Sequence, residues 1–171
     1  MERSGLMDIV IREANREDTE LLRRIEAGDG YPYPYKKTNE DYEKYMDEGD
    51  EFFIAEADDA PAGYISMVDC IYLGRTVCRL HLLAVLKEYQ GKGIGTRLIQ
   101  HFEEQAKSRG YHRIIINVYQ DNEEAIKFYE GKGYRHWFTI PYRYEKGIDA
   151  YVMFKDIGQT YVDQMKAQEG K

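Results

Sequence analysis

A glycine-rich turn is the part of this sequence with the clearest chemistry. Residues 90–96 contain glycines at positions 91, 93 and 95, between an apolar segment, 80–86, and a run of apolar residues at helical spacing. Glycine lets the backbone come close to a ligand because no Cβ intervenes. The first N–H groups of the helix that follows attract negative charge. The sequence therefore predicts a strand, a turn and a helix that bind a phosphate or pyrophosphate group.

The spacing of the glycines distinguishes between kinds of phosphate-binding turn. A Walker loop requires serine or threonine after Gly-Lys, which this turn lacks, and the dinucleotide fingerprint requires a third glycine where Thr96 stands. The pattern that fits is Gln-x-x-Gly-x-Gly, formed by Gln90, Gly93 and Gly95. This pattern resembles the acyl-CoA loop of the GCN5-related N-acetyltransferase (GNAT) superfamily.

A second motif lies further along the chain, at residues 122–134. Asn122, Ala125, Phe128, Tyr129 and Gly133 follow the spacing Asn-x-x-Ala-x-x-Phe-Tyr-x-x-x-Gly, which resembles a segment of the same superfamily. Asparagine is a favoured helix N-cap, so a helix is expected to begin after Asn122. The two motifs occur in the superfamily's order, and the resemblance extends over about residues 9–154.

Composition places the chain among ordinary globular proteins. Its 171 residues are 43% hydrophobic and 32% charged, which fits a single domain, 1–171, with a core at about 9–154. The net charge of −7 argues against a nucleic-acid partner. No segment has the length of a membrane span or the pattern of a signal peptide, so we expect a cytoplasmic protein with Cys70 and Cys78 as reduced thiols. The spacing of Cys and His predicts no metal site.

Periodicity predicts an α/β fold. We expect a mixed, largely antiparallel sheet with a parallel pair in the middle and helices on both faces. Asp58 follows the second strand, and we expect the hairpin loop there to be longer than two residues. The resemblance implies that the fourth and fifth strands splay apart. The expected strands are 9–11, 51–57, 63–69, 76–85, 113–119, 134–139 and 148–154. Helices are expected after Asn15 or Asp18, from about Thr38, after the glycine turn and after Asn122. The tail after residue 157 is expected to be helical or loose.

The resemblance implies transfer of an acetyl group from acetyl-CoA to a primary amine. Tyr129 corresponds to the residue that protonates the departing thiolate, and a phenol is protonated at neutral pH. Asn122 corresponds to a cofactor contact. The backbone of the preceding strand is expected to pair with the pantetheine arm. The expected cofactor-binding residues are Leu83, Ala84, Val85, Gln90, Gly91, Lys92, Gly93, Ile94, Gly95, Thr96, Asn122 and Tyr129.

The general base is left open by the sequence. His81 lies on the key strand and can titrate near neutral pH, which makes it a candidate, although it is also compatible with a purely structural role. Members of the superfamily often place a carboxylate on these strands, but Arg79 and Asn117 stand there.

The acceptor is expected to bind near two tyrosine-rich segments. Tyr31, Tyr33 and Tyr35 crowd one proline-containing loop, where aromatic faces can hold a cation. Tyr142 belongs to a segment, 141–153, that resembles the tail of protein N-terminal acetyltransferases. A small-molecule amine is the preferred acceptor, and a peptide or protein N-terminus is the alternative. A CoA-binding module without activity is a further one.

We also expect a homodimer. Trp137, Phe138 and Tyr151 lie in the last two predicted strands, and their exposure there would exceed what solubility favours.

Overall fold

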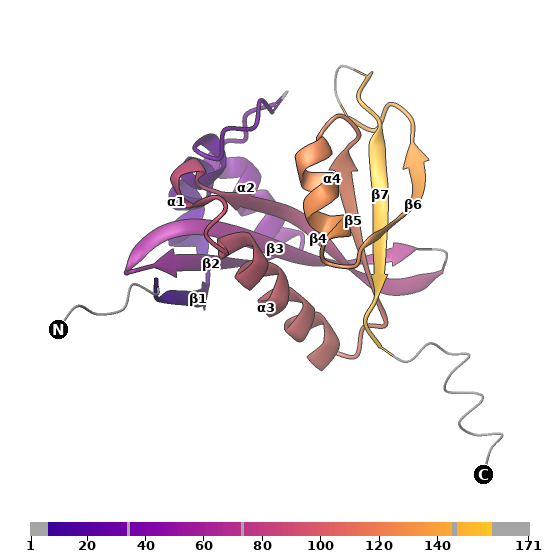
Figure 1. Ribbon diagram of the computed structural model, residues 1–171, viewed down its shortest axis with the longest axis horizontal. Coiled ribbons are helices and arrows are strands. Elements are labelled where there is room, and N and C mark those ends of the chain that lie inside the picture. Colours follow the sequence, from indigo (N-terminus) through magenta and orange to yellow (C-terminus); the bar gives the residue numbers. More distant parts are fainter. Residues whose placement is uncertain (1–6, 34, 73, 145–146, 159–171) are drawn as a thin grey trace, which may run out of the picture. The chain divides into compact units, whose positions relative to one another are not determined.

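A computed structural model describes residues 7–33, 35–72, 74–144 and 147–158 (Figure 1). Each expected strand and helix in these ranges is present. The strands are β1 (Ile9–Glu13), β2 (Glu51–Ala57), β3 (Ala60–Tyr72), β4 (Arg75–Val85), β5 (Arg113–Tyr119), β6 (Arg135–Ile140) and β7 (Ala150–Asp156). The helices are α1 (Thr19–Ala27), α2 (Asn39–Asp47), α3 (Ile94–Ser108) and α4 (Glu123–Glu130), with short 3-10 turns η1 (Arg16–Asp18) and η2 (Lys87–Tyr89). The expectation for the tail falls mostly outside the described residues.

The strands form one mixed sheet in the order β1-β2-β3-β4-β5-β7-β6. β4 and β5 are parallel, with Cys78 opposite Ile114 and Leu80 opposite Ile116. The pairs β1–β2, β2–β3, β5–β7 and β6–β7 are antiparallel. The predicted mixed sheet with a central parallel pair is therefore confirmed. The parallel pairing ends at Leu80 and Ile116, the point from which the resemblance implies that the two strands diverge.

The hairpin between β2 and β3 corrects one expectation. Ala57 pairs directly with Ala60, so the connection is a tight two-residue turn and not a longer loop. Asp58 and Asp59 both have positive φ, at 49° and 65°. Aspartate tolerates this left-handed conformation better than most residues, and two such residues match the twist of the flanking strands. The usual sequence signal for such a turn is a glycine, and this turn has none.

The described residues fall into two units, which we treat separately. The first unit comprises Met1–Val68 and His81–Phe102, and the second comprises Asp69–Leu80 and Glu103–Lys171. Three elements, β3, β4 and α3, contribute residues to both units. That the chain forms a single domain stays a prediction.

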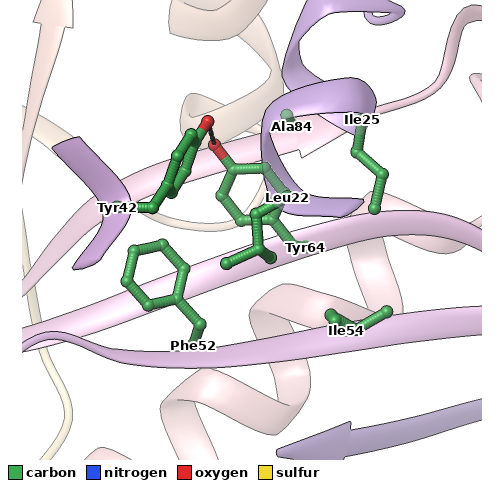
Figure 2. Packing of buried hydrophobic residues seen from close by; sticks show 7 residues of the cluster. All are labelled: Leu22, Ile25, Tyr42, Phe52, Ile54, Tyr64 and Ala84. Atoms are coloured by element: carbon green, nitrogen blue, oxygen red, sulfur yellow. Dashed lines mark hydrogen bonds between the residues drawn. The ribbon is translucent and has the colours of Figure 1, made fainter. Parts of the chain in front are cut away.

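The core of the first unit lies between α1, α2 and the sheet (Figure 2). Phe52 and Ile54 of β2 point into this core, whereas the ring of Phe53 lies 4.8 Å from that of His101 on α3. Because successive strand residues face opposite sides, helices cover both faces of these strands, as predicted. The fully buried residues of the cluster are Leu22, Ile25, Tyr42, Phe52, Ile54, Tyr64 and Ala84.

The second unit carries β5, β6, β7 and α4. Asn122 caps α4, because its side-chain oxygen accepts a hydrogen bond from the Ala125 N–H at 3.0 Å. Tyr129 of α4 is buried, and its ring lies 5.8 Å from that of Tyr134. The local signals in this segment, a cap and an apolar face, are therefore sufficient to place the helix.

Two further expectations concern cysteines and surface aromatics. Cys70 and Cys78 are both thiols, as expected. Trp137 is half-buried, with its ring 5.7 Å from Tyr72 and 5.5 Å from Phe154, and Phe138 and Tyr151 are half-buried as well. The aromatic side chains from which a homodimer was expected are therefore half-buried and not exposed. Dimerisation itself stays a prediction. In the part of the chain that the structure describes, every helix is too short or too polar to cross a bilayer.

Candidate active site

The glycine turn of the first unit has the geometry that the sequence predicts. Gly91 and Gly93 adopt φ values of +73° and +90°, which other residues adopt only with strain. A Cβ added at either position would meet no atom within 4 Å, so backbone conformation and not crowding requires glycine here. Helix α3 begins at once, and Arg97 donates its N–H to the Gly93 carbonyl at 3.0 Å. The N–H groups before Arg97 therefore have no intrahelical acceptor and are suited to an anion.

Gln90 has a role that the sequence did not indicate. Its side-chain Nε2 donates to the backbone carbonyls of Asp29, at 2.7 Å, and Val85, at 2.9 Å. Lys87 adds a backbone bond to Gly28, at 2.9 Å. The Gln90 amide thus fixes the turn to the end of β4 and to the loop after α1. The side chain therefore supports the turn that is expected to bind the cofactor.

Another glycine, outside the turn, lies close to the residues on either side of it. A Cβ added to Gly63 of β3 would lie 2.8 Å from the Ala84 carbonyl oxygen and 3.2 Å from side-chain atoms of Val85 and Ile94. Gly63 therefore lets β3 approach the end of β4 and the start of α3. The expected strand 63–69 began at Gly63, so its place inside β3, where glycine often marks a close approach, became clear only from the structure.

We predict that Gln90→Leu weakens acetyl-CoA binding. Leucine keeps the volume but removes both donors, so the carbonyls of Asp29 and Val85 lose their partner and the turn loses its support. We expect the dissociation constant, measured by calorimetry, to rise about fivefold to tenfold. Gln100→Leu, on the exposed side of α3, is the matched control and should bind as the wild type does. Equal affinity of both variants and the wild type would remove Gln90 from this role.

His81 forms a pair with a buried aspartate. Its Nδ1 lies 2.8 Å from Oδ1 of Asp50, whose side chain is 3% exposed, while the His81 side chain is 24% exposed. Ser66 Oγ donates to the same oxygen at 3.1 Å, and accepts the backbone N–H of Leu82 at 3.2 Å. In a neutral imidazole ring, a carboxylate partner holds the proton on Nδ1, which leaves Nε2 with its lone pair. The contact between Asp50 and His81 was not predicted from the sequence, because Asp50 lies in the turn before β2, 31 residues from His81.

The tyrosines of the α1–α2 loop make bonds within the protein. Tyr33 donates its hydroxyl to Asp29 at 2.6 Å, and Tyr35 donates to Asp41 at 2.8 Å. The ammonium group of Lys37 lies 5.2 Å from the centre of the Tyr33 ring. Burial raises the pKa of Asp29, and the hydrogen bond from Tyr33 opposes that rise. The face of Tyr33 that was expected to attract a cationic acceptor therefore already has a cation from the loop itself.

The loop is further fixed by a buried ion pair. Lys37 Nζ lies 2.8 Å from Glu26 Oε2, and the two side chains are 11% and 7% exposed. Tyr64 donates its hydroxyl to the same carboxylate at 3.1 Å, and its oxygen lies 3.0 Å from that of Tyr42 (Figure 2). This network joins α1, α2 and β3 beneath the loop. Tyr31 and Tyr33, with ring centres 4.7 Å apart, therefore belong to a loop that this network supports.

Tyr129 lies in the second unit with its side chain buried. Burial raises its pKa above the ordinary value for tyrosine, because the phenolate would lose its solvation. The hydroxyl therefore stays protonated through the neutral and moderately alkaline range. Such a group is suited to donate a hydrogen bond to a developing negative charge.

Tyr142 stands at the rim of an open hollow. The hollow has a volume of about 480 Å³, and Tyr142 itself is 80% exposed, with φ of 50°. Its backbone N–H donates to Asp149 at 2.9 Å, which holds the turn in shape. The lining residues are Gln120, Asp121, Pro141, Tyr142, Gly147, Ile148 and Asp149.

Each unit brings part of the expected site together. In the first, the end of β4 (Leu83, Ala84 and Val85) leads through η2 directly into the glycine turn, and His81 lies on the same strand. Ile94 is buried and Lys92 lies 5.7 Å from the centre of the Tyr89 ring. In the second, Asn122 and Tyr129 lie at the start and end of α4.

Comparison with known proteins identifies the family. The sequence model of the acetyltransferase (GNAT) family matches residues 11–134. An uncharacterized N-acetyltransferase of Methanocaldococcus jannaschii is 35% identical over 72% of this chain, which spans 59% of that relative's length. N-alpha-acetyltransferase 30 of Schizosaccharomyces pombe is 32% identical over 68% of this chain and 82% of its own. The chain therefore belongs to the GNAT family.

Solved structures agree with this assignment. Ard1 from Thermoplasma volcanium superposes with a TM-score of 0.72 at 26% identity, over 88% of this chain and 99% of that one. Naa50 of Arabidopsis thaliana, solved with the bisubstrate analogue CoA-Ac-MVNAL, gives a TM-score of 0.71 at 23% identity, over 86% and 98%. The protein is an acetyl-CoA-dependent acyltransferase with the GNAT fold, and acetyl-CoA is its cosubstrate.

Proposed function

We propose that the protein transfers the acetyl group of acetyl-CoA to the α-amine of a peptide or protein N-terminus. The observation that carries this proposal is the open hollow beside Tyr142, which suits an extended chain. A small molecule is usually bound in a site that buries most of its surface. The similarity to the N-alpha-acetyltransferase of fission yeast supports the same class of acceptor. The proposed acceptor is thus a peptide or protein N-terminus, whereas the sequence alone favoured a small-molecule amine.

His81 is the proposed proton acceptor. The amine nitrogen attacks the thioester carbonyl, a C–N bond forms, and the C–S bond breaks with its electron pair on sulfur. The amine proton passes to Nε2 of His81, whose Nδ1 proton is held by Asp50. An α-amine has a pKa near 7.7–8.0, so a substantial fraction is already neutral at physiological pH. Tyr129, by its motif, donates a hydrogen bond to the departing thiolate.

A panel of acceptors tests the proposal. Short peptides with a free N-terminus are compared with the same peptides blocked by formylation, with lysine-containing peptides, and with polyamines and free amino acids. Mass spectrometry locates the acetyl group, and thiol release gives the rate. We expect acetylation only on the free α-amine of peptides. Turnover confined to small amines would overturn the proposal and would favour a small-molecule acceptor.

We predict that Asp50→Asn lowers kcat by about tenfold to a hundredfold. An amide in place of the carboxylate can donate to Nδ1, which moves the ring proton to Nε2 and removes the acceptor. Acetyl-CoA affinity should not change, because neither residue lies in the glycine turn. His81→Ala should lower kcat by a similar factor.

The double variant of Asp50→Asn and His81→Ala separates this role from a structural one. If Asp50 acts through His81, the double variant should be no slower than His81→Ala alone. Additive losses, or unchanged kcat in Asp50→Asn, would contradict the role of Asp50 as a positioning residue. Ser66→Ala is a milder variant, since it removes the hydroxyl bond to Asp50 and the acceptor of the Leu82 N–H but leaves the histidine contact.

A further inference from the structure

Arg79 of β4 has an unsatisfied donor in the second unit. Its Nε is buried and has no hydrogen-bond partner. Among the described residues, no carboxylate forms an ion pair with its guanidinium group. A buried donor without a partner costs about 1–3 kcal/mol, and charged groups cost more. The Nε of Arg79 can therefore donate a hydrogen bond to an anion from outside the fold.

Asn117 of β5 presents the complementary atom. Its Oδ1 is also buried without a partner, and it can only accept a hydrogen bond. Arg79 is paired in register with Ile115, and Asn117 follows two residues later, so Arg79 and Asn117 face the same side of the sheet. With strands about 4.8 Å apart and a rise of about 3.3 Å per residue, their Cα atoms lie roughly 8 Å apart.

A second cation and two tyrosines lie near Arg79. Burial raises the pKa of Tyr144 to about 12, and the charges of Arg143 and Arg79 oppose that rise. The same two charges oppose the rise that burial causes in the pKa of Tyr72. The ring of Tyr144 lies 4.1 Å from that of Tyr119, which fixes one wall of this cationic region. The region stands out in a chain whose net charge is −7.

We infer that Arg79 and Asn117 form a subsite for an acidic residue at the start of the acceptor peptide. The guanidinium group binds the carboxylate of an aspartate or glutamate within the first two residues, and Asn117 Oδ1 accepts a backbone N–H of the same peptide. A neutral side chain would leave the buried Nε of Arg79 without an acceptor, so it would be disfavoured. The inference rests on the proposed function, because it names the acceptor within that class.

Matched peptides test the subsite. Pairs that differ only as Glu against Gln, or Asp against Asn, at position one or two are compared by kcat/KM. We expect the wild type to prefer the acidic member at least tenfold, a preference that 0.5 M salt reduces. Arg79→Gln should lose the preference by slowing the acidic peptides and sparing the neutral ones. Arg75→Gln, an exposed arginine on the same strand, is the control and should keep the preference.

The outcomes separate this inference from the proposed function. Equal rates for acidic and neutral peptides in the wild type would overturn the subsite and leave N-terminal acetylation standing. Turnover of free glutamate or aspartate, abolished in Arg79→Gln, with no peptide acetylated, would keep the anion site and overturn the peptide acceptor. The wild-type comparison needs no variant, and Arg79→Met offers a second one that keeps the side-chain volume if Arg79→Gln fails to fold.

Discussion

Tyr129→Phe is expected to lower kcat by about a hundredfold to ten-thousandfold, the usual range for the loss of one acid catalyst. The ring and its contact with Tyr134 remain, and only the hydroxyl is lost. Because burial raises the pKa of Tyr129, the wild-type hydroxyl stays protonated as the pH rises through the neutral range. The rate ratio between wild type and variant should therefore be nearly constant from pH 6 to 9.

The effect should be confined to catalysis. Acetyl-CoA affinity is expected to change little, and the loss should be greatest for acceptors with which thiolate departure limits the rate. Tyr134→Phe is the matched control, since it removes the hydroxyl of a neighbouring buried tyrosine that has no assigned role in the reaction. Full kcat in Tyr129→Phe with every accepted amine would show that the residue serves packing or cofactor contact alone.

Lys37→Met is expected to destabilise the protein by about 3–5 kcal/mol. The variant leaves the Glu26 carboxylate, which is 7% exposed, without its cation, while the hydroxyl of Tyr64 still donates to it. It also removes the cation from the face of Tyr33. Denaturation by urea, with the slope compared to that of the wild type, measures the loss in the free energy of unfolding.

Two companion variants show whether the unpaired charge is the cause. The double variant of Lys37→Met and Glu26→Gln should recover part of the loss, because no buried charge then stays unpaired. Lys44→Met breaks an exposed pair with Glu48, with side chains 69% and 59% exposed, and should cost less than about 0.5 kcal/mol. A loss as small as this in Lys37→Met would mean that the ion pair does not hold the loop.

The sequence alone predicted the secondary structure well, because its signals are local. Thr38 forms a capping box with Asp41 at the start of α2, and Asn122 caps α4, as favoured N-cap residues do. Gly91 and Gly93, which the spacing places in the expected cofactor turn, adopt positive φ angles. Each of these features depends on residues within a few positions of one another, so the order of the amino acids is sufficient to show it.

The sequence also indicated the family, since its two motifs keep fixed spacings. The sequence alone could not show which interaction each side chain makes. Gln90, expected to contact the cofactor, also donates its side-chain amide to the carbonyl of Asp29, 61 residues away. The tight turn at Asp58 and Asp59 was missed because it depends on aspartates that accept a left-handed conformation in place of glycine.

Tertiary structure decided the electrostatic state of the site. The carboxylate that orients His81 is Asp50, 31 residues away, and nothing in the spacing of the two residues suggests their contact. Burial determines that Tyr129 keeps its proton, and folding buries the Nε of Arg79 without a partner among the described residues. Protonation and unpaired charge depend on which groups folding removes from water and places together. Amino-acid order therefore defined the elements and the family, and packing between distant residues defined the chemistry that they can perform.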